Sequence, residues 1–211
     1  MKAREEILRR VRAANVAALE GRPSDGDHGI RRDYSHTREL ADPVGMFVER
    51  VEDYKATVVR TGSDGVAAAV AESLLGARRV VVPAGFNPSW LPDGIDVVQD
   101  EPALSSAELD TVDAVVTSAV VGIAVTGTIV LDHTQGQGRR ALTLVPDLHV
   151  CVITADQIVG DVPEAVGRLS DSVSAGRPLT WVSGPSATVD IELIRVHGVH
   201  GPRTLRVVLV Q

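Results

Sequence analysis

Short valine-rich runs alternate with segments of helical spacing between residues 43 and 120. The expected strands are 56–60, 78–85, 96–100 and 114–120. The expected helices are 43–54, 63–76 and a segment that begins at 105–112. Strands that alternate with helices form a parallel or mixed sheet with helices on both faces. The sequence therefore predicts an α/β domain built on a mixed sheet.

The pattern changes at Gly122, where extended runs begin to follow one another with short connections. The expected strands of this half are 122–132, 139–145, 148–153, 180–184, 188–196 and 204–211. One further helix is expected at 163–175. A β-rich half thus follows the alternating half within the same domain.

The N-terminal segment differs from the rest of the chain. Residues 3–20 have the spacing of an amphipathic helix, with Ile7, Leu8 and Val11 on one face. Residues 21–42 are polar and rich in Gly and Pro, which is typical of a loop or arm. We therefore divide the chain into an arm, 1–42, and an α/β domain, 43–211. The arm is expected to cover a cleft, to bind a partner or to clasp a second copy in a homo-oligomer.

The charge balance is acidic, with 28 Asp and Glu against 21 Lys and Arg and a net charge of −7. An acidic surface does not neutralise phosphates, so we expect no nucleic-acid partner. Apolar runs are too short to span a bilayer, and charges are scattered through the N-terminal helix, unlike a signal peptide. The expected location is cytoplasmic, with no membrane span.

Cys151 is the single cysteine of the chain. One cysteine cannot form an internal disulfide or a multi-cysteine metal site. It lies in an apolar run, which favours a buried thiol over a catalytic one. We expect no cofactor and no metal, so the purified chain should be colourless.

Two short motifs have weaker interpretations. Residues 136–141 have the spacing G-x-G-x-x-A, but the expected strand after them favours a hairpin tip over a dinucleotide site. His197 and His200 form H-x-x-H, and the surrounding glycines argue against a metal-binding helix. They are either polar residues at a turn, or His200 is a general acid or base.

Two glycine-broken runs, Gly122–Gly138 and Gly184–Pro202, are the candidate functional segments, because glycine within a strand permits close approach of a ligand. The candidate ligand-binding residues are Thr126, Gly127, Thr128, Asp132, His133, Arg139 and Ser186. The candidate catalytic residues are Asp190, Glu192 and His200. Gly127 is equally consistent with a β-bulge, and Asp190 and Glu192 with surface charges or with partners of Arg139 and Arg140.

The same segments resemble the LUD-domain family over roughly residues 40–211. The matching positions are Gly127, Thr128, Pro146, His149, Gly184, Pro185, Ser186, Asp190, Glu192, Gly198, His200, Gly201 and Pro202. The resemblance implies a fold similar to sugar-phosphate isomerases, CoA transferases and 5-formyltetrahydrofolate cyclo-ligase. It also implies a cytoplasmic role in oxidising L-lactate to pyruvate with two iron–sulfur partner proteins. Val125 departs from the family, which commonly has Glu at this position.

Three hypotheses follow. The first is a non-redox subunit of an L-lactate-oxidising system, acting with iron–sulfur proteins on a small anionic metabolite. The second is a stand-alone enzyme or binding protein for a phosphorylated or CoA-like metabolite in an isomerase-type cleft. The third is a regulatory or structural module with a degenerate site. The glycine-broken segments further predict that Thr126, Thr128, Asp190, Glu192 and His200 surround one concavity.

Overall fold

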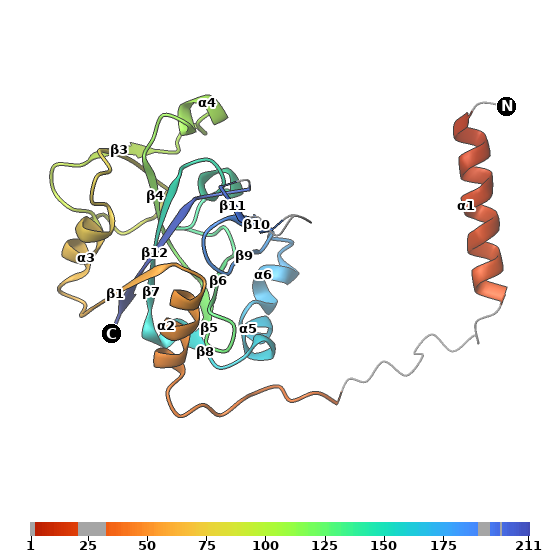
Figure 1. The fold of residues 1–211 in the computed structure, drawn as a ribbon, viewed down its shortest axis with the longest axis horizontal. Helices are drawn as coiled ribbons and strands as arrows, with labels where there is room; N and C mark the ends of the chain where they lie inside the picture. Colours follow the sequence, from red (N-terminus) through yellow and green to blue (C-terminus); the bar gives the residue numbers. More distant parts are fainter. Residues whose placement is uncertain (1–2, 21–32, 190–194, 199) are drawn as a thin grey trace. The chain divides into compact units, whose positions relative to one another are not determined.

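The computed structural model describes residues 3–20, 33–189, 195–198 and 200–211 (Figure 1). Contacts divide the chain into two units, 1–34 and 35–211. The first contains helix α1 (Ala3–Glu20), the helix expected at 3–20. The side chains of Ile7, Leu8 and Val11 are exposed on α1.

The larger unit is built on a six-stranded sheet in the order β1-β12-β7-β4-β2-β3. Every neighbouring pair is parallel. Its strands are β1 (Thr57–Thr61), β2 (Arg79–Val82), β3 (Asp96–Gln99), β4 (Ala114–Ser118), β7 (Leu148–Thr154) and β12 (Thr204–Val210). The α/β prediction and these six strand predictions are confirmed, because buried parallel strands are continuous β-branched runs.

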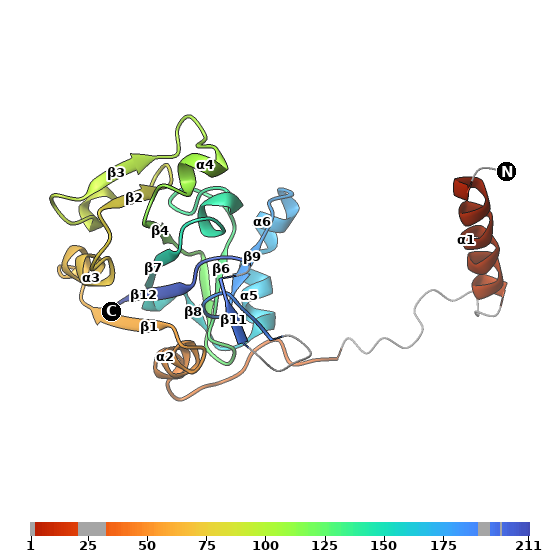
Figure 2. The same ribbon diagram turned by 45° about the horizontal axis from the view of Figure 1, so that its top comes forward.

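Helices cover both faces of this sheet. One face, which includes Val116, Val150 and Val208, packs against α3 (Val66–Ser73). The other face packs against α2 (Pro43–Asp53) and a smaller sheet. Figure 2 shows α3 and α2 on opposite sides of β1. Each fully buried valine of the sheet stabilises the fold by roughly 1.5–3 kcal/mol.

The smaller sheet has the order β8-β5-β6-β9. Its strands are β5 (Val121–Ile123), β6 (Thr128–Leu131), β8 (Ile158–Val159) and β9 (Thr180–Val182). The expected single strand 122–132 is therefore an antiparallel hairpin of β5 and β6. Gly127 lies in its turn with φ 58°, and a Cβ there would lie 2.6 Å from the carbonyl carbon of Arg50. The close approach allowed by Gly127 is thus to the backbone of α2.

The strand predicted at 139–145 is wrong. Arg140–Thr143 form a short 3₁₀ helix, whose Leu142 is buried with Val81 and Val115 on the sheet face. The hairpin tip predicted at 136–141 is wrong for the same reason, since this segment joins β6 to the 3₁₀ helix. Burial of Leu142 overrides the strand propensity of the run.

The remaining elements refine the predicted boundaries. They are α4 (Ser106–Leu109), α5 (Val162–Arg168), α6 (Ser170–Ser174), β10 (Ala187–Val189), β11 (Arg195–His197) and two short 3₁₀ helices at Pro88–Trp90 and Ala155–Gln157. The helix predicted at 163–175 is two helices, and the strand predicted at 188–196 is an antiparallel hairpin, β10–β11. Within the described segments, no helix is long and apolar enough to cross a membrane.

Candidate functional site

The direction of strand addition reverses between β2 and β4, which are neighbours in the main sheet. Open α/β sheets bind ligands outside the carboxyl ends of strands at such a switch point. Here the segment after β6 covers these ends: the Gly136 N–H donates to the Ala84 carbonyl (2.8 Å), and the Ser118 N–H donates to the Gly136 carbonyl (2.7 Å). The chain's own loop therefore fills the crevice.

Beside this loop lies an open cavity of about 420 Å³, which we call cleft 1. Its polar lining includes His133, Thr134, Gln135, Arg139 and Arg140. The His133 Nδ1 lies 2.7 Å from the Gly138 carbonyl, and its Nε2 lies 2.9 Å from the Thr180 hydroxyl. A carbonyl only accepts, so Nδ1 donates to Gly138, and Nε2 is hydrogen-bonded to the Thr180 hydroxyl. Both ring nitrogens of His133 thus hold the loop.

Arg139 is also engaged by the chain. Its guanidinium donates to both carboxylate oxygens of Asp100 (2.7 and 3.0 Å) and to the Leu104 carbonyl. Burial alone would raise the pKa of Asp100, but the hydrogen bonds from Arg139 and Leu104 hold it below its usual value. Arg139 therefore fastens the loop to the end of β3.

The carboxylate of Asp132 is buried below the same loop. It accepts hydrogen bonds from the hydroxyls of Ser172 and Thr134, both at 2.6 Å, and lies 3.6 Å from Arg177. Burial raises the pKa of Asp132, but these hydrogen bonds and the positive charge of Arg177 outweigh it and hold the pKa below its usual value. Asp132 therefore links the loop to α6.

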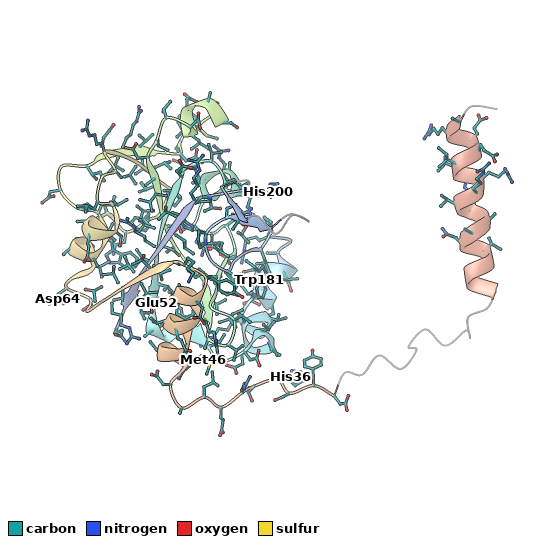
Figure 3. All side chains as sticks on the ribbon, in the orientation of Figure 1. His36, Met46, Glu52, Asp64, Trp181 and His200 are labelled. Atoms are coloured by element: carbon teal, nitrogen blue, oxygen red, sulfur yellow. The ribbon has the colours of Figure 1, made fainter. Side chains whose placement is uncertain are left out.

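A second cavity of about 260 Å³, cleft 2, is lined by polar side chains from three segments. They are Arg140, Thr143, Trp181, Ser183, Ser186 and His200. Figure 3 shows Trp181 and His200 on the same side of the larger unit. The Ser186 hydroxyl oxygen accepts from the backbone N–H of His200 (3.1 Å), and the backbone N–H of Ser186 donates to the Pro202 carbonyl (2.8 Å). These bonds fix two walls of cleft 2 to each other.

Thr126 and Thr128 do not line cleft 2, but they are hydrogen-bonded to its wall through Ser183. The Thr126 hydroxyl donates to the Thr128 Oγ1 (2.8 Å), which lies 2.7 Å from the hydroxyl oxygen of Ser183. Three hydroxyls thus connect the β5–β6 turn to the cleft wall. Of the predicted site residues, Ser186 and His200 therefore line cleft 2, and Thr126 and Thr128 reach its wall only through Ser183.

The other predicted site residues are placed differently. Asp190 and Glu192 lie outside the described residues. His133 and Arg139 belong to cleft 1, and Asp132 lies below it.

Several residues of cleft 2 and its floor, Arg140 and His149 among them, were not among the predicted site residues. Arg140 lines both clefts, and its guanidinium donates to the Thr143 hydroxyl (3.1 Å). His149 lies under cleft 2 and is 2 % exposed. A histidine within an otherwise apolar strand is the signal that would have identified it.

The chain offers little for metal or thiol chemistry in its described part. Cys151 is free and buried, and burial raises the pKa of its thiol to about 12. The thiol therefore stays protonated at neutral pH. Within residues 3–20, 33–189, 195–198 and 200–211, no three His, Cys, Asp or Glu side chains are grouped as a metal site would require.

Comparison with known proteins agrees with the sequence resemblance. The model of the LUD domain matches residues 3–210. The chain is 54% identical over 170 residues to lactate utilization protein C of Deinococcus radiodurans, covering 81% of this chain and 80% of that protein. It is 28% identical to an uncharacterized protein of Neisseria meningitidis, covering 97% of this chain and 92% of that protein. A crystal structure of a DUF162 family protein from Deinococcus radiodurans superposes with a TM-score of 0.73 at 46% identity, covering 84% of this chain and 99% of that chain.

Proposed function

Because the chain belongs to the LUD domain family, we propose that it acts in lactate utilization as a subunit without a redox centre of its own. The observation that carries the proposal is the relative named lactate utilization protein C, 54% identical over 80% of its length. In this function, iron–sulfur partner proteins in the cytoplasm accept the two electrons of L-lactate oxidation. One buried cysteine cannot hold a cluster, so those electrons need a partner.

The contribution of this chain is to bind a small anionic metabolite in cleft 2. Arg140 supplies a permanent positive charge, and a guanidinium pairs with a carboxylate through two parallel hydrogen bonds. The hydroxyls of Ser183 and Ser186 supply further donors on the opposite wall. A hydrogen-bonded cleft of this size suits a compact ligand such as L-lactate or pyruvate.

Growth on L-lactate tests the function. A strain that lacks the gene should grow on pyruvate but not on L-lactate, and the wild-type gene should restore growth. The Arg140→Gln gene should restore little growth, whereas Arg60→Gln, a change at an exposed arginine on β1, should restore it fully. Normal growth of the deletion strain on L-lactate would contradict the proposal.

A second candidate function uses cleft 1. Its place beside the switch point favours a phosphorylated or CoA-like metabolite, in line with the isomerase-like fold that the family resemblance implies. Inorganic phosphate or CoA would then raise the thermal unfolding midpoint, and L-lactate would not. The opposite result favours binding in cleft 2.

A further inference from the structure

A second, smaller cavity adjoins cleft 2. This floor cavity has a volume of about 30 Å³, shares Thr143 and Ser186 with cleft 2 and is also lined by His149 and Leu205. A space of this size accommodates about one water molecule. His149 is the most deeply buried polar residue that lines this cavity.

We propose that His149 binds the ligand of cleft 2 from below, through its Nδ1 and one water molecule in the floor cavity. This inference rests on the proposed function and identifies a ligand-positioning residue in the same site.

The position of His149 is energetically unfavourable for a polar side chain, because its strand neighbours are apolar and buried. It lies on β7 between Val115 of β4 and Leu205 of β12, both buried apolar residues. Burying a polar ring costs free energy unless hydrogen bonds compensate for lost water. The Nε2 of His149 lies 2.8 Å from the Thr117 hydroxyl, which is itself fully buried. This bond leaves Nδ1 as the ring nitrogen available to the cavity.

The charge state of His149 fits this role. Burial and the positive charge of Arg140 lower the pKa of His149 to about 4, so the ring is neutral at physiological pH. A neutral ring fixed by Thr117 presents one defined nitrogen to the cavity. Arg140, which lines cleft 2, is thus close enough to the ring for its charge to act on it.

Substitutions that imitate one ring nitrogen at a time test the inference. The amide of Asn reaches the position of Nδ1, and the longer amide of Gln reaches that of Nε2. By calorimetry with sodium L-lactate, His149→Leu in the full chain should weaken binding about tenfold, the effect of one lost hydrogen bond. His149→Asn should recover most of the affinity, and His149→Gln should not.

Nitrogen NMR of the histidines gives an independent readout. Saturation with L-lactate should shift the Nδ1 resonance of His149 but not that of His133, whose Nδ1 is bonded to Gly138. Unchanged affinity in a folded His149→Leu variant, or recovery by Gln alone, would overturn the inference while Arg140-dependent binding still supported the proposed function. Absence of L-lactate binding by the wild-type protein would contradict both.

Discussion

The hydroxyl oxygens of Thr128 and Ser183 lie 2.7 Å apart, although 55 residues separate them in the sequence. This bond joins β6 of the smaller sheet to the wall of cleft 2. It connects the first glycine-broken segment with the residue that directly precedes the second, and the second segment contributes Ser186 and His200 to the same cleft.

Thr128→Val removes this bond at nearly constant volume. We expect a loss of about 1 kcal/mol in unfolding free energy, because the hydroxyls of Thr126 and Ser183 both lose the buried Thr128 oxygen as a partner. The same change at the exposed Thr57 of β1 should cost less than about 0.5 kcal/mol. Urea unfolding measures both, and equal values would contradict the role assigned to the bond.

Asp132→Asn should change the acid sensitivity of the fold. The folded-state pKa of Asp132 is lowered, so its carboxylate stabilises the fold above about pH 4 and loses this contribution as the pH falls through the folded pKa. At pH 7 the variant should lose about 2 kcal/mol, and its stability should fall less steeply with acid than that of the wild type. Asp64→Asn, at an exposed position, is the control. Parallel pH profiles for wild type and Asp132→Asn would refute this explanation.

Gly127→Ala should separate backbone strain from a steric clash. Gly127 and Gly76 both have positive φ, but only at Gly127 would a Cβ meet another backbone, 2.6 Å from the Arg50 carbonyl carbon. We expect Gly76→Ala to cost about 1 kcal/mol and Gly127→Ala at least about twice that. Similar losses would show that α2 moves aside easily.

Removal of residues 1–34 should leave the larger unit folded. The truncation ends before Arg38, whose N–H donates to Glu164 (3.0 Å), and before Leu40, which packs against the core. We expect an unchanged unfolding midpoint but weaker association with a second copy or a partner, because Ile7, Leu8 and Val11 form an exposed apolar stripe on α1. Ile7→Glu in the full chain should reproduce the weaker association. A non-cooperative melt would show that α1 belongs to the core.

Cys151 should resist thiol reagents in the folded protein, because its thiol is buried and its pKa is raised to about 12. A chromogenic disulfide reagent should react only after denaturation. Stoichiometric reaction of the native protein at neutral pH would mean that the strand β7 opens readily.

The main sheet could be predicted because each strand is a continuous apolar run, whose burial on both faces leaves a local signature. The loop after β6 could not, because its partners are distant: Asp132 binds Ser172, and Arg139 binds Asp100. The 3₁₀ helix could not be predicted for the same reason, because Leu142 packs on sheet residues that are distant in the sequence. In the candidate site, Ser186 and His200 could be predicted because Ser and His are common functional residues. Arg140 could not, because only the fold brings it to cleft 2.

Arg140 borders both clefts, so two anions bound in them at once would share one guanidinium. An anion held in one cleft uses positive charge that an anion in the other would need. Each therefore reduces the affinity for the other by the same factor, whichever binds first. A lactate-sized ligand and a phosphate-bearing one would then be mutual antagonists on a single chain, without any change in its conformation.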